Sequence, residues 1–147
     1  MSYTFIFTHN FFYSSVDDDD ELKPIIPISF KYQQYEYSYP MLIDSGSKVS
    51  SLGPEHAKAL GIEDITVLPE RHGFGIGGPT RYRVLEGVTI IIAEKEIEIT
   101  APIHFVENMQ GLEFGVLGRK GIFNVLRIAF REHEGPYIFM ALDSHIA

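Results

Sequence analysis

An aspartate stands directly after an apolar stretch near the centre of the first half of the sequence. The run Met41–Ile43 is typical of a buried strand, and Asp44 follows it with no spacer. Small residues come next: Ser45, Gly46 and Ser47. An ionised carboxylate at the end of an interior strand needs hydrogen bonds, which a serine hydroxyl and the backbone N–H groups of a tight turn can supply. Such a turn fits two interpretations, an Asx-turn that only caps the strand or a site where the carboxylate does chemistry.

Two other segments bear on this choice. The sequence GFGIGGPTRYRV (residues 73–84) predicts a hairpin whose glycines free its tip to move and let its backbone approach a ligand closely. The residues at that tip are Gly75, Ile76, Gly77 and Gly78. Further along, a second apolar strand end, Val116 and Leu117, stops at Gly118 and continues into Arg119, so it mirrors residues 43–46 without their acid.

In this order and at this spacing, the three segments resemble the retropepsin-like aspartic peptidases. Members of that family have an Asp-Ser/Thr-Gly turn after an apolar strand, a flap with a Gly-Ile-Gly-Gly tip, and a later turn of two hydrophobic residues, Gly and Arg. The resemblance covers roughly residues 27–130. It implies an all-β fold, a small closed or partly closed β-barrel of the single-lobe acid-protease type with one or two short helices.

The resemblance also implies an aspartic endopeptidase that acts on peptide or protein substrates as a homodimer. A partial copy of the motif at Leu142–Ile146 has His145 where the turn needs glycine, so each chain contributes one catalytic residue, Asp44. Two carboxylates about 4 Å apart at an effective dielectric of about 20 repel by roughly 4 kcal/mol, so the pair holds one proton. The ionised member takes a proton from a shared water while the other donates to the substrate carbonyl oxygen. This reaction needs no metal and no other cofactor.

By the same resemblance, the neighbours of Asp44 have supporting roles. Ser45 hydrogen-bonds across the two facing turns, and Gly46 faces the substrate backbone. The hairpin tip around Ile76 closes over the bound peptide and limits the entry of water. Leu117 and Gly118 pack beside the catalytic turn.

One position departs from the family pattern. Retroviral members usually have an acid two residues after the glycine of the catalytic motif, and it pairs with the arginine of the later turn. Here that position is Lys48, so Arg119 lacks its expected partner, and Asp143 or an acid in residues 131–134 is a candidate substitute. A cation near Asp44 also favours a second interpretation, a catalytically inactive retropepsin-like module that binds peptides or proteins.

The elements that must position these residues are mostly strands. Runs rich in β-branched and aromatic residues, with turn signals between them, predict several short strands and hence a barrel. The predicted strands lie in residues 25–32, 34–43, 86–106 (two or three strands), 126–132 and 136–143.

Helix is scarce in the sequence. One short helix is expected at residues 53–62, where Pro54 suits the first helical position and Gly61 the stop, and a second over residues 118–126. We expect a single domain over residues 1–147, with residues 1–22 as an extra strand or an arm.

Composition excludes several classes of partner and site. The formal net charge of −8 disfavours nucleic acid and anionic membranes, both of which reward clustered lysine and arginine. Part of that charge is the acidic run Asp17–Glu21, which we expect in a solvated loop. There is no cysteine, so disulfides, thiolate metal sites and a cysteine nucleophile are excluded. No signal peptide or membrane-spanning run is recognisable, and we expect a cytoplasmic protein.

Two patterns that suggest other chemistry lack the context it requires. Residues 73–78 match G-x-G-x-x-G, but a strand-like run rather than a helix follows, so a dinucleotide site is disfavoured. The six histidines lack the spacing of a metal site. Of these, His56 is expected on a helix surface and His104 in a strand.

Overall fold

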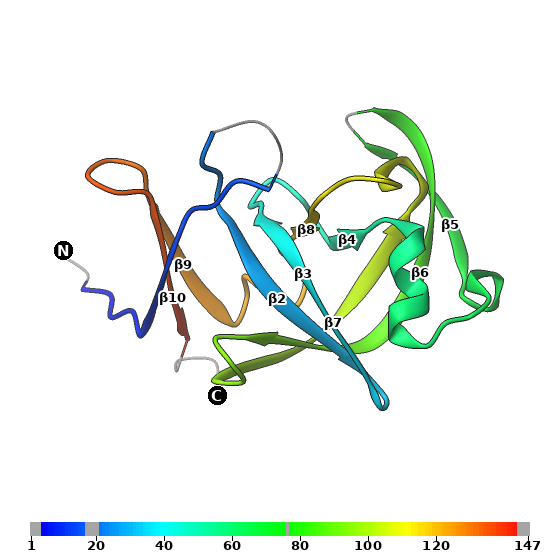
Figure 1. Ribbon diagram of the computed structural model, residues 1–147, viewed down its shortest axis with the longest axis horizontal. Coiled ribbons are helices and arrows are strands. Elements are labelled where there is room, and N and C mark those ends of the chain that lie inside the picture. Colours follow the sequence, from blue (N-terminus) through cyan, green and yellow to red (C-terminus); the bar gives the residue numbers. More distant parts are fainter. Residues whose placement is uncertain (1–3, 17–20, 76, 144–147) are drawn as a thin grey trace.

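The structure is a computed structural model that describes residues 4–16, 21–75 and 77–143. Within these residues the chain forms ten strands and three short 3₁₀ helices (Figure 1). The strands are β1 (His9–Phe12), β2 (Ile25–Tyr32), β3 (Tyr35–Ile43), β4 (Ser50–Leu52), β5 (Glu70–Gly75), β6 (Gly78–Ile92), β7 (Ile97–Val106), β8 (Gly115–Leu117), β9 (Leu126–Arg131) and β10 (Tyr137–Leu142). The helices are η1 (Pro54–Leu60), η2 (Ile65–Val67) and η3 (Glu107–Met109).

Six of the strands close into a barrel. They follow one another in the order β2-β3-β8-β4-β7-β6, and antiparallel pairing of β6 with β2 completes the ring. β5 pairs only with β6, as the outer arm of a hairpin. The predicted fold class, a small single-lobe β-barrel with little helix, is confirmed.

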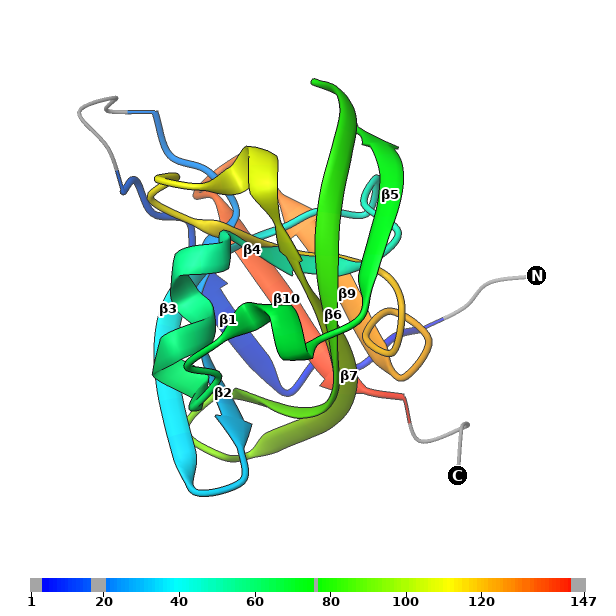
Figure 2. The same ribbon diagram turned by 90° about the vertical axis from the view of Figure 1, so that its right-hand side faces the viewer.

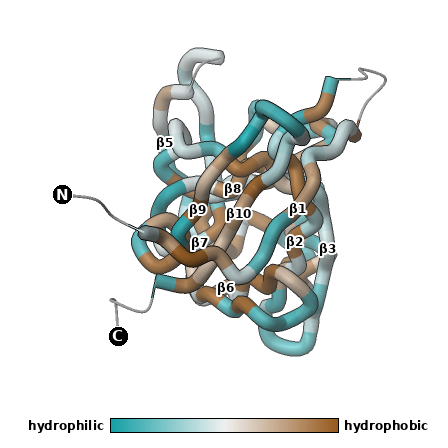
Figure 3. The backbone as a smooth tube through the Cα atoms, turned by 90° about the vertical axis from the view of Figure 1, so that its left-hand side faces the viewer, coloured by the Kyte–Doolittle hydropathy of each residue, from teal (hydrophilic) through white to brown (hydrophobic). Residues whose placement is uncertain are grey.

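The barrel is stabilised by an apolar interior. Alternate residues of each strand point inward, and the largest of them are fully buried, among them Phe30, Phe105 and Met41. Burying one such side chain contributes about 1.5–3 kcal/mol relative to leaving it in water. Hydrophobic stretches follow the strands, and the turns that join them are largely hydrophilic (Figure 3).

A second, three-stranded sheet lies on one side of the barrel, away from the β5–β6 hairpin (Figure 1). Its order is β1-β10-β9, so a strand from the N-terminal segment pairs with the last strand of the chain. The final strand pair was predicted correctly. Residues 9–12, within the segment expected as an extra strand or an arm, form a strand. Residues 17–20 of the acidic run lie outside the described part of the chain.

Of the two predicted helices, the first is present and the second is not. η1 begins at Pro54 and ends before Gly61, whose left-handed backbone (φ 83°) stops it, as expected. The second predicted helix is wrong, because residues 119–125 form hydrogen-bonded turns rather than a helix. Gly121 adopts a positive φ of 79° there, which interrupts helical geometry. No helix in the described residues is long and apolar enough to cross a membrane.

Removing a ring from the barrel interior should cost far more than removing one from its surface. Phe30 is completely buried, so Phe30→Ala is expected to lower the free energy of unfolding by about 3–5 kcal/mol through lost burial and a residual cavity. Phe74 is 87% exposed, so Phe74→Ala is its matched control and should change stability by less than about 0.5 kcal/mol. Urea denaturation measures both, and equal losses would contradict the assigned core.

Candidate active site

Asp44 extends β3 past its last residue and is fixed there by β8. The two strands run parallel, with Ile43 opposite Leu117. The backbone N–H of Asp44 donates to the carbonyl oxygen of Leu117 over 3.0 Å. The two apolar strand ends recognised in the sequence are therefore neighbours, although Asp44 and Leu117 are 73 positions apart in the sequence.

The turn after Asp44 brings a backbone donor to its carboxylate. The N–H of Gly46 donates to Oδ1 over 2.8 Å, and the N–H of Ser47 donates to the Asp44 carbonyl oxygen over 3.2 Å. Asp44 is half-buried and Ser45 is exposed at the apex of the turn. Within the described chain, Oδ2 has no hydrogen-bond partner, so this oxygen is free to meet a group from outside.

The turn at Gly118 and Arg119 is hydrogen-bonded to the segment that follows Asp44. Gly118 donates its N–H to the buried hydroxyl of Ser50 over 3.0 Å, and Arg119 donates its N–H to the carbonyl oxygen of Ser47 over 2.9 Å. A Cβ atom on Gly118 would lie 2.2 Å from the carbonyl oxygen of Val49, which explains the glycine. Sequence reasoning missed Ser50, because nothing local distinguishes its hydroxyl from those of the neighbouring serines.

The charged residues beside the turns lack the expected acidic partner. Lys48 and Arg119 are both exposed, and neither forms an ion pair with another described residue. Asp143, one candidate substitute, lies 3.5 Å from Arg127 instead. The absence of an acid at position 48 thus leaves a cationic rim around the turns.

The glycine-rich segment forms the predicted hairpin. β5 and β6 pair up to Gly75 opposite Gly78, and the hairpin projects beyond the barrel (Figure 2). Ile76, the predicted centre of its tip, lies outside the described residues, and Gly77 lies beside it.

The outer face of this hairpin is tied to η3, a contact that sequence reasoning missed. Arg81 binds Glu107 through two hydrogen bonds of 3.0 Å. This interaction raises the pKa of the Arg81 guanidinium and lowers that of the Glu107 carboxyl. The base of the hairpin therefore has a polar attachment, whereas Phe74 near the tip is almost fully exposed.

His56 is buried, so its predicted place on the helix surface is wrong. Its Nδ1 lies 2.7 Å from the hydroxyl oxygen of Tyr37, and its Nε2 lies 3.3 Å from Oε1 of Glu55. Burial lowers the pKa of His56, and the nearby Glu55 carboxylate partly opposes this. His56 thereby joins η1 to β3. The ring of Tyr39, also on β3, contacts the rings of both Tyr37 and His56.

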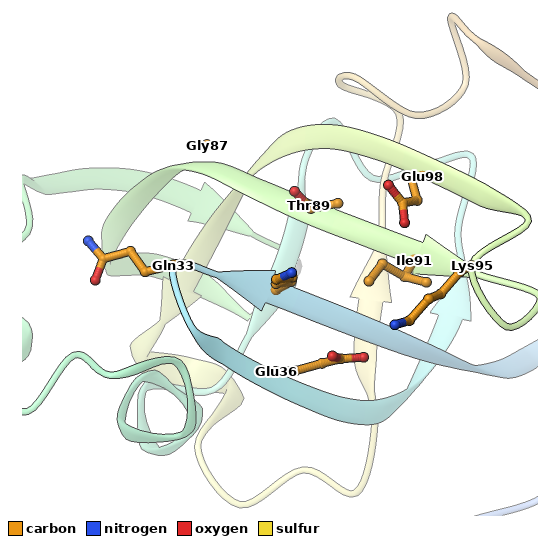
Figure 4. Close-up of a pocket in the computed structure, with 8 residues that line it drawn as sticks. Gln33, Glu36, Gly87, Thr89, Ile91, Lys95 and Glu98 are labelled. Atoms are coloured by element: carbon orange, nitrogen blue, oxygen red, sulfur yellow. The ribbon is translucent and has the colours of Figure 1, made fainter.

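A hollow of about 220 Å³ lies where residues of β2, β3, β6 and β7 and of their connecting turns come together (Figure 4). It is open and polar, and its side chains come from the β2–β3 and β6–β7 hairpins. They are Lys31, Gln33, Glu36, Gly87, Thr89, Ile91, Lys95 and Glu98. The hollow contains both lysines and glutamates, and none of the residues of the turn at Asp44 lines it. Among the described residues, no cluster of His, Asp and Glu could hold a metal ion.

Comparison with known proteins supports the fold and gives no relative by sequence. No family model matches the sequence, and no curated protein does. Among solved structures, the chain is similar to a retropepsin-like aspartic protease from Rickettsia conorii, with a TM-score of 0.58 and 15% identity. The match covers 91% of this chain and 99% of that one. The chain has a retropepsin-like fold.

The two turns approach each other so closely that position 118 has no room for a side chain. Gly118→Ala is expected to destabilise the protein by about 1–3 kcal/mol or more, because a Cβ there collides with the backbone of Val49. Gly75→Ala is the control, since open space surrounds that position. Thermal unfolding of both variants tests this, and a Gly118→Ala protein as stable as wild type would contradict the packing described.

The burial of His56 predicts a pH dependence of stability. Its pKa is below the usual value in the folded state, so the unfolded chain binds more protons as the pH falls. The free energy of unfolding should therefore decrease as the pH falls from about 7 to about 5, and this decrease should be smaller in His56→Gln. A titration of the His56 ring by NMR should give a midpoint below about 6.5. A midpoint above that value would contradict the assignment.

Proposed function

We propose that the protein is an aspartic endopeptidase whose active site forms when Asp44 of two identical chains meet in a homodimer. The observation that carries this proposal is the position of Asp44, held at the end of β3 by Leu117 and Gly46 with one carboxylate oxygen free. The retropepsin-like barrel and the glycine-tipped β5–β6 hairpin support it.

Peptide hydrolysis by such a pair follows from shared proton chemistry. Mutual repulsion keeps one proton on the pair, so one carboxylate is ionised and the other protonated. The ionised group removes a proton from water as the water oxygen bonds to the substrate carbonyl carbon, and the protonated group donates to the carbonyl oxygen. The resulting tetrahedral intermediate collapses as the amide nitrogen takes up a proton and the C–N bond breaks. The products are a carboxylic acid and an amine.

The surrounding residues have supporting roles in this proposal. Ser45, which is exposed in the turn, hydrogen-bonds to the second copy. Gly46 presents backbone to the substrate, and the tip with Gly75, Gly77 and Gly78 covers it. Val116, Leu117 and Gly118 form the support beneath the catalytic turn.

One observation favours a second function, a catalytically inactive module that binds peptides or proteins. The hydrogen bond from Gly46 to Asp44 also closes a purely structural Asx-turn, and the exposed Lys48 lies four residues further on. A cation close to a pair of carboxylates favours their ionised forms and opposes proton sharing.

Replacing the Asp44 carboxylate by an amide distinguishes between the peptidase and the binding module. Asp44→Asn is expected to abolish cleavage of an unfolded protein between about pH 4 and pH 7, since an amide neither accepts nor donates the shared proton. The fold and the dimer should persist, as judged by circular dichroism and sedimentation. Asp64→Asn is the matched control, because Asp64 only caps η2 through Thr66. Unchanged cleavage by Asp44→Asn contradicts the mechanism, and a wild-type protein without cleavage at any pH favours the binding module.

A further inference from the structure

A band of side chains crosses the barrel on the same face as Asp44. Residues that pair across neighbouring strands point to the same face of a sheet, and the pairs Leu42–Val116, Val116–Ser51, Ser51–His104 and His104–Val84 connect five strands. The band is Leu42, Val116, Ser51, His104 and Val84. Asp44 follows Leu42 by two residues, so strand alternation puts it at the end of this band.

The band is accessible, in contrast to the residues between its members. All but Ser51 are partly exposed, whereas the alternating residues Ile43, Leu117 and Ile103 are buried in the core. The band begins beside Asp44 and ends at the base of the β5–β6 hairpin, where Tyr82 stacks on His104 with ring centroids 4.6 Å apart. A peptide that lies on Asp44 beneath the hairpin contacts this surface.

Cations flank the band between these two ends. The N–H of Lys120 donates to the carbonyl oxygen of Lys48 over 2.9 Å, so the backbones of the two lysines are neighbours. Both are exposed, and neither is ion-paired with another described residue. Their effect reaches His104, whose pKa is lowered by burial first, then by Lys120 and Lys48, with Glu86 opposing.

These cations oppose the charge of the rest of the chain. The protein has a formal net charge of −8, which repels acidic peptides at long range. Next to the turn after Asp44 the exposed cations are Lys48, Arg119 and Lys120. The anionic groups of this region are Asp44 itself and Glu86, which acts on His104 against the two lysines. A substrate carboxylate placed on the band gains the partner that these lysines lack within the described chain.

We propose that the peptidase prefers substrates with an acidic side chain close to the scissile bond, bound by Lys48 and Lys120 beside the Tyr82–His104 pair. This proposal rests on the endopeptidase function proposed above and specifies its class of substrate. Lys48, the departure from the family pattern, is then a specificity-determining residue.

The test compares peptides that differ by one charge. A set of otherwise identical peptides carries Glu or Gln at each of the four positions on either side of the cleaved bond, and kcat/KM is measured at pH 6, where the Glu side chain is ionised. At one position at least, wild type should cleave the Glu peptide about fivefold faster than the Gln peptide, the size expected for a partly exposed ion pair. The preference should decline in 0.5 M NaCl because salt screens such pairs.

Charge-removing variants identify the residues responsible. The double variant Lys48→Gln, Lys120→Gln should lose the Glu preference, whereas Lys58→Gln, an exposed cation on η1, should retain it. Equal cleavage of every Glu and Gln pair by wild type overturns this proposal and leaves the endopeptidase function standing. Cleavage of no peptide in the set overturns the endopeptidase function itself, and this proposal with it.

Discussion

The parallel pairing of β3 with β8 is the constraint on which the candidate site depends. It brings together two strand ends that are distant in the sequence, and the N–H of Asp44 is bound by Leu117 as a direct result. Parallel neighbours require a long connection, and here the chain makes most of the barrel and the projecting hairpin between them. The same pairing places Gly118 so close to Val49 that no side chain fits. A carboxylate on one strand end and a glycine on the other are therefore two consequences of one contact.

Hydrogen bonds join the two turns next to this strand pair. Ser50 and Ser47 accept N–H groups from Gly118 and Arg119, so the two turns are joined through backbone and a buried hydroxyl rather than through charged side chains. The acid–arginine pair expected from the resemblance is absent, because Lys48 stands at the position of the acid, and the backbone contacts hold the turns instead. The lysine is then available to interact with something other than the fold, which is the basis of the specificity that we propose.

Much of the fold could be predicted from the sequence because its signals are local. Strand runs, the glycine-tipped hairpin and the η1 boundaries at Pro54 and Gly61 depend on residues close together in the chain. The errors came from tertiary contacts. His56 is buried because Tyr37 and Tyr39 of β3 pack against it, and the turns at residues 119–125 replace a helix because Gly121 adopts a positive φ against Ala101. Ser50 became recognisable only once Gly118 was placed beside it.

In the proposed dimer, Asp44 of one chain faces Asp44 of a second copy, and cross-linking measures this proximity directly. The chain has no cysteine, so Asp44→Cys introduces a single thiol. A short bifunctional thiol reagent should join two Asp44→Cys chains rapidly into a covalent dimer on a denaturing gel. Ser38→Cys, an exposed site earlier on the same strand, should cross-link only slowly. Equal rates for the two variants, or an Asp44→Cys protein that stays monomeric, would contradict a dimer in which the two Asp44 side chains meet.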